Sequence, residues 1–185
     1  MRTLIGAVGY RNLRDHSAAF EVIERLERLE PEAEVTLEDA SYNPVALVQW
    51  LESLPADERF AQVVFVAAVA RSGRSGGDLT AYRWDGCVPP DDVVQQAVTE
   101  AVTGIINLDN TLTIAGYFKA LPALVAVVEI EPIDHAFGSE FSTPVSDAIS
   151  DACGLARRLA TRPGDIAALP ARGLELRPHA QASWS

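Results

Sequence analysis

One segment restricts the possible folds more than any other: Val63–Val69 (VVFVAAV) is apolar at every position. Such a strand must be covered on both faces, which is typical of a central strand in a parallel sheet. Parallel strands need crossover helices, and Ser17–Leu29 has apolar residues at helical spacing after a first apolar strand, Thr3–Val8. The pattern therefore predicts an α/β fold.

The other segments continue this alternation. Val35–Leu37 is a second short strand, Asn43-Pro44 is a typical helix start, and Leu124–Ile130 is the last strongly apolar strand. Further elements are expected at Leu79–Trp84 (an edge strand, with antiparallel pairing as an option), at Pro90–Val102 and Thr111–Leu121 (helices), and from Thr143 to about Leu159 (a helix). We expect a mostly parallel, twisted sheet of about five strands with helices on both faces.

Length and composition indicate the domain organisation and the kind of partner. Residues 1–160 are expected to form one α/β domain, and residues 161–185 a Pro/Ala-rich, loosely ordered tail. A formal net charge of −11 argues against nucleic acid and anionic membranes as partners. The two cysteines form no CxxC unit, and the most apolar stretch, Leu121–Ile130, is too short to span a bilayer. We expect a cytoplasmic monomer without a membrane partner.

Candidate site residues lie where parallel strands end, because ligands bind at that edge of open α/β sheets. Asp15 and His16 follow the first strand, Asp39 follows the second, and Asp109 precedes a later helix. A histidine with one or two carboxylates suits a divalent transition metal. Each residue also has a structural interpretation: Asp15 and Asp109 as helix caps, Asp39 in an Asx-turn, and His16 in a first helical turn. Spacing alone leaves both interpretations open.

Other motifs are weaker. Gly6–Gly9 (GAVG) lacks the third glycine of a dinucleotide-binding loop and is followed by bulky residues, which disfavours nucleotide binding. His135 is expected to be a solvated loop histidine. Arg71 and Arg74 could bind a carboxylate of a partner, although most such loops are simply solvated. The chain has no GxSxG nucleophile motif.

Three stretches together resemble the nickel–iron hydrogenase maturation proteases, endopeptidases that remove the C-terminal extension of the hydrogenase large subunit. They are Ile5–Leu26 (IGAVGYRNLRDHSAAFEVIERL), Glu38–Leu51 (EDASYNPVALVQWL) and Ala126–Leu159, which includes EIEPIDHAFGSEFSTPVSDAI. Their order and spacing carry the resemblance, which covers about residues 2–160 and leaves the tail out.

The resemblance implies a nickel-contacting site that departs from the family pattern. His16 stands where the family has an acidic residue, Ala67 or Ala68 where it has an aspartate, and Asp109 near where it has a histidine. His16 and Asp109 are then the implied metal contacts. Asp39 matches the family's aspartate after the second strand, and Asp15 or Asp39 is the candidate general base.

Two functions follow from this resemblance. The first is a maturation endopeptidase that recognises nickel in the hydrogenase large subunit precursor, so that the metal belongs to the substrate and the chain needs no cofactor of its own. The second is a catalytically inactive relative that binds or scaffolds the precursor during hydrogenase assembly, since neither Ala67 nor Ala68 can ligate a metal.

Overall fold

The computed structural model describes residues 1–29 and 33–174. Within them the strands form a six-stranded sheet in the order β2-β1-β3-β5-β4-β6. The strands are β1 (Thr3–Val8), β2 (Val35–Asp39), β3 (Gln62–Ala68), β4 (Leu79–Trp84), β5 (Leu124–Ile130) and β6 (Ala171–Arg172). The neighbours from β2 to β5 pair in parallel, and β4 is antiparallel to β5. The predicted fold class, including the antiparallel option for Leu79–Trp84, is confirmed.

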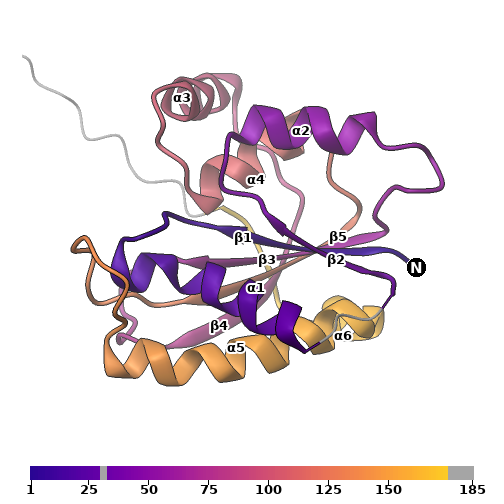
Figure 1. The fold of residues 1–185 in the computed structure, drawn as a ribbon. Coiled ribbons are helices and arrows are strands. Elements are labelled where there is room, and N and C mark those ends of the chain that lie inside the picture. Colours follow the sequence, from indigo (N-terminus) through magenta and orange to yellow (C-terminus); the bar gives the residue numbers. More distant parts are fainter. Residues whose placement is uncertain (30–32, 175–185) are drawn as a thin grey trace, which may run out of the picture.

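Helices lie on both faces of this sheet (Figure 1). On one face lie α1 (Ala18–Arg28), α5 (Thr143–Thr161) and α6 (Pro163–Ala168). On the other lie α2 (Pro44–Ser53) and α4 (Leu108–Tyr117), and α3 (Asp91–Val102) packs against α4. A short 3-10 helix, η1 (Arg14–Ser17), connects the loop after β1 to α1.

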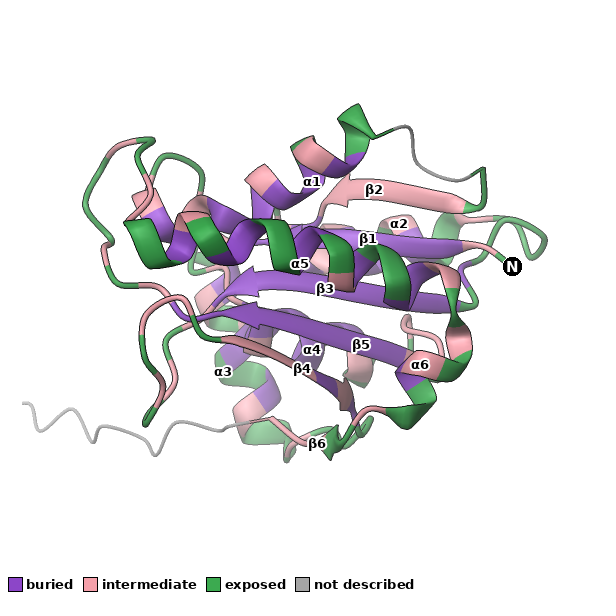
Figure 2. Ribbon diagram, turned by 90° about the horizontal axis from the view of Figure 1, so that it is seen from below, coloured by how far each residue is buried: buried purple, intermediate pink, exposed green. Residues whose placement is uncertain are grey.

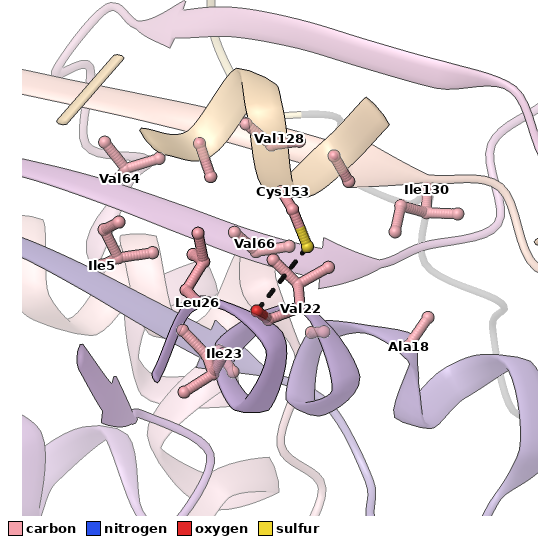
Figure 3. Packing of buried hydrophobic residues seen from close by; sticks show 14 of the residues in the cluster. Ile5, Ala18, Val22, Ile23, Leu26, Val64, Val66, Val128, Ile130 and Cys153 are labelled. Carbon is pink, nitrogen blue, oxygen red and sulfur yellow. Dashed lines mark hydrogen bonds between the residues drawn. The ribbon is translucent and has the colours of Figure 1, made fainter. Parts of the chain in front are cut away.

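The apolar run of β3 is buried on both faces of the sheet. Val64 and Val66 pack into the core beneath α1 and α5, whereas Val63 and Phe65 pack into the core on the α2–α4 face, and all four are fully buried. Figure 2 shows β3 and β5 buried along their length, and Figure 3 shows the side chains between α1, α5 and the sheet. Each such side chain stabilises the fold by about 1.5–3 kcal/mol.

Two boundaries differ from the sequence predictions. Helix α4 begins at Leu108, and the Asn107 side chain caps it by accepting a hydrogen bond from the Asn110 N–H at 2.8 Å. Asp109 therefore lies in the first turn of α4 and is not its cap. After Thr161 the chain forms α6 and β6, because the fully buried Ile166 anchors this segment to the α1–α5 core. The rest of the predicted tail, with His179, lies outside the described residues.

No helix in the described part of the chain is both long and apolar enough to cross a membrane.

Candidate functional site

The carboxyl ends of β1, β2, β3 and β5 meet at one edge of the sheet, where the loops after β1 and β5 lie side by side (Figure 1). Leu13 forms a parallel bridge with Gly138. The Gly138 N–H donates to the Asn12 carbonyl at 2.8 Å, and the Arg14 N–H donates to the Gly138 carbonyl at 3.0 Å. Segments more than a hundred residues apart in sequence thus form one surface.

Asp15 fastens these two loops together. Its Oδ2 accepts hydrogen bonds from the Ile133 and Asp134 N–H groups at 2.9 and 2.8 Å and from the Ser142 hydroxyl at 2.8 Å. Its Oδ1 accepts from the Ser142 N–H at 2.8 Å. Burial alone would raise the pKa of Asp15, but these bonds to the charged form hold it below the usual value. The carboxylate is fully buried and serves as a structural anchor.

His16 lies beside His135 at the surface of this edge. The two ring centroids are 6.4 Å apart and the rings are nearly perpendicular, at 82°. Gly9 makes room for this arrangement, because a Cβ atom there would lie 2.7 Å from the His16 carbonyl oxygen. Burial and the neighbouring His135 lower the pKa of His16, against an opposite influence of Asp15.

Asp39 ends β2 and makes a local turn. Its Oδ1 accepts a 3.0 Å hydrogen bond from the Ser41 N–H and a second bond from the Ser41 hydroxyl, which is the Asx-turn predicted as its structural interpretation. Its Oδ2 pairs with Arg11 at 3.1 Å. The Asp39 side chain keeps 35% of its surface exposed, so solvent still reaches this carboxylate.

Asp109 is bound by an arginine of the chain itself. The Arg71 Nη1 and Nη2 groups donate to Asp109 Oδ2 and Oδ1 at 2.8 and 2.9 Å, a bidentate pair. Burial would lower the pKa of Arg71, but Asp109 and the neighbouring Glu129 raise it. Both carboxylate oxygens of Asp109, a predicted metal contact, therefore bind the charged guanidinium of Arg71.

Glu129 is the centre of this charged cluster, and sequence reasoning missed it. Its side chain is fully buried in β5, where Oε1 accepts from Arg71 at 2.7 Å and from the Tyr82 hydroxyl at 3.0 Å, and Oε2 accepts from Arg74 at 2.7 Å. Burial would raise the pKa of Glu129, but the two arginines lower it. Burial of Tyr82 raises the pKa of its hydroxyl, and the charge of Glu129 raises it further.

Glu129 lies next to Ala67, one of the two positions where the resemblance expects an aspartate. Ala67 of β3 is the register partner of Glu129 in β5, so both side chains emerge on the α2–α4 face of the sheet. Where the resemblance expects a metal-binding aspartate, the chain has a buried alanine next to a glutamate that two arginines neutralise. We name Arg71, Arg74, Tyr82, Asp109 and Glu129 the arginine cluster.

The predicted metal contacts His16 and Asp109 belong to different layers of the molecule. Asp109 lies in α4, on one face of the sheet, and His16 lies in η1, before the helix α1 on the other face. Among residues 1–29 and 33–174, no three His, Cys, Asp or Glu side chains are placed to hold a metal ion. A cavity of about 380 Å³ is lined by Asp39 with Arg11, Phe20 and Glu24, but by neither His16 nor Asp109.

Comparisons with known proteins agree with this fold. No protein-family model and no curated protein sequence matches the chain. Among solved structures, it is similar to the hydrogenase 2 maturation peptidase of Thaumarchaeota archaeon SCGC_AB-539-E09, with 21% identity, a TM-score of 0.56, and coverage of 84% of this chain and 95% of that one.

Two structures from E. coli give similar results. The hydrogenase maturating endopeptidase HybD has 16% identity and a TM-score of 0.61, with coverage of 84% of this chain and 89% of HybD. The endopeptidase HycI also has 16% identity and a TM-score of 0.61, with coverage of 96% of this chain and all of HycI. The chain thus has the fold of the hydrogenase maturation proteases, as the three sequence stretches predicted.

Proposed function

We propose that this protein is a hydrogenase maturation endopeptidase, which recognises nickel in the large subunit precursor and removes the precursor's C-terminal extension. The observation that carries the proposal is the fold, shared with hydrogenase maturation peptidases over 84% or more of the chain in the structures described above. The C-terminal edge of the sheet, with His16 at its surface, is then where the precursor binds.

Within this proposal the carboxylates take different roles. Asp39 is the candidate general base, because its side chain is 35% exposed and can reach a water molecule. Asp15 positions the loops, because its oxygens accept four hydrogen bonds from the chain. The nickel ion belongs to the substrate, so the enzyme needs no resident cofactor.

A second candidate function is binding of the precursor without cleavage. One specific observation favours it: all three predicted acidic residues are already bonded within the chain, Asp15 to backbone N–H groups, Asp39 to Arg11 and Asp109 to Arg71. A protein of this kind would hold the precursor during hydrogenase assembly.

Incubation of the purified protein with a nickel-loaded large subunit precursor separates the two functions. An endopeptidase shortens the precursor by its C-terminal extension, as measured by mass spectrometry, and Asp39→Asn stops the cut while Glu58→Gln, an exposed residue outside this edge, does not. Retention without cleavage supports the binding protein. Absence of both retention and cleavage contradicts the proposal.

A further inference from the structure

We infer that His16 and His135 form a two-imidazole contact site for a divalent transition metal, whose other ligands come from a second molecule. That this molecule is the nickel-loaded precursor rests on the proposed function, whereas the histidine site itself does not. His135 replaces Asp109 as the partner of His16, because the arginine cluster holds Asp109 on the other face of the sheet.

The separation of the rings lies at the upper limit for one shared ion. A coordinating imidazole nitrogen lies about 2.0–2.1 Å from a zinc-like metal, so two rings on one ion have centroids roughly 5 Å apart in a tetrahedral site and about 6.4 Å apart when they bind on opposite sides of the ion. The His16 and His135 centroids are 6.4 Å apart. The pair therefore matches two rings on opposite sides of one ion, and a tetrahedral site requires the rings to approach by about 1 Å.

The backbone fixes this pair in advance. The Asp15 N–H donates to the Asp134 carbonyl at 3.2 Å, and the Asp134 N–H donates to Asp15 Oδ2 at 2.8 Å. His16 and His135 are the residues that follow these two aspartates, so the reciprocal bonds hold their Cα atoms in register.

The exposure of the pair also suits a metal that another molecule brings. His135 is exposed, and the same loop presents Phe137 with 82% and Ile133 with 54% of their surface exposed. A partner that brings a metal to the histidines would cover these apolar side chains.

The site is incomplete within the part of the chain that the structure describes. Asp15 is saturated, and Asp134 binds the Arg14 guanidinium at 2.6 Å and the Ala136 N–H at 2.8 Å. A structural zinc site has four protein ligands, but here two histidines stand without a third metal-binding side chain. The chain alone should therefore bind a metal weakly, and tightly only when a partner supplies the remaining ligands.

Metal titration of the isolated protein, followed by NMR of its imidazoles, tests the site without any precursor. The chain has three histidines, which keeps the imidazole region of the spectrum simple. As Ni²⁺ is added, the signals of His16 and His135 should broaden together at one metal ratio, ahead of the His179 signal. The same titration with Zn²⁺ should shift the two signals together.

A pair of variants completes the test. His135→Ala should weaken Ni²⁺ affinity by about tenfold or more, because removal of a ligand costs at least as much as loss of an outer-shell partner. His179→Ala is the matched control and should leave the affinity unchanged. Independent titration of His16 and His135, or unaltered affinity in His135→Ala, would overturn the site. Such a result leaves precursor cleavage to be decided by its own experiment, and a lack of cleavage leaves the metal titration intact.

Discussion

The arginine cluster and the histidine pair, His16 and His135, lie at the same edge of the sheet. They differ in whether their polar groups are already bonded within the chain. In the cluster, Glu129 is fully buried and the Arg71 side chain is 8% exposed, and every charge has an opposite charge within 3 Å. In the pair, the His16 ring is half-buried and the His135 ring is exposed, and their centroids are 6.4 Å apart.

This difference distinguishes groups that stabilise the fold from groups that can bind another molecule. Charged groups whose hydrogen bonds are satisfied inside the chain hold the fold in place, since removing one leaves its partner unpaired in a low-dielectric interior. Groups with unused capacity at the surface are those that another molecule can bind. The arginine cluster belongs to the first kind and the histidine pair to the second.

The largest expected effect is in the arginine cluster. Glu129→Ala leaves two buried arginines without their shared carboxylate, and we expect the free energy of unfolding to fall by about 3–5 kcal/mol. Urea denaturation measures it. Glu58→Ala, an exposed residue on a long pair with Arg2, is the control and should stay within about 0.5 kcal/mol. A loss below about 1 kcal/mol in Glu129→Ala would show that the cluster is not a structural unit.

The next largest effect is expected at Asp15, which joins the loops after β1 and β5. Asp15→Asn replaces one of the two accepting oxygens by an amide nitrogen, which donates and cannot accept N–H bonds, and should lower the free energy of unfolding by about 2–3 kcal/mol. Because Asp15 holds His135 beside His16, Ni²⁺ affinity should fall as well, even in buffer where the variant is folded. Unchanged metal affinity in a destabilised variant would separate the two roles.

A smaller effect should appear in the pH dependence of stability. The folded-state pKa of His16 lies below its unfolded value, so the unfolded chain takes up a proton first as the pH falls below about 6.5. The free energy of unfolding is therefore fully favourable above this pH and decreases as the pH falls towards the folded-state pKa. His16→Asn should show a flatter profile between about pH 7 and pH 5. Identical profiles would contradict the assignment.

Asp39→Asn should have the smallest effect on stability. Its ion pair with Arg11 is exposed, with side-chain exposures of 54% and 35%, and an asparagine can still accept the Ser41 N–H bond. We expect a change in the free energy of unfolding below about 1 kcal/mol in thermal or urea denaturation. A larger loss would place Asp39 with the arginine cluster, among the groups that hold the fold.

The fold could be predicted because its signals are local. The all-apolar Val63–Val69 run and the amphipathic segment after Thr3–Val8 each constrain their own neighbourhood, and the right-handed crossover rule then leaves few topologies. The start of α4 was misplaced because Asn107, rather than Asp109, caps it. Both residue types cap helices well, so propensity could not choose between them.

The site could be predicted only in part, because its contacts join distant segments. Asp15 bonds to Ser142, 127 residues away, and Asp109 bonds to Arg71, 38 residues away. One signal was present in the sequence: a glutamate inside the apolar strand Leu124–Ile130 must be paired, and Arg71 and Arg74 follow a strand that is apolar throughout. The approach of His135 to His16 had no such signal.

The most direct test of the account is the nickel-dependent retention of a large subunit precursor by immobilised wild-type protein, His135→Ala and Asp109→Asn. If the histidine pair contacts the metal and Asp109 only stabilises the fold, His135→Ala loses the nickel-dependent part of the retention. Asp109→Asn, if it folds, keeps that part. Full nickel dependence in His135→Ala, together with its loss in Asp109→Asn, would contradict the account.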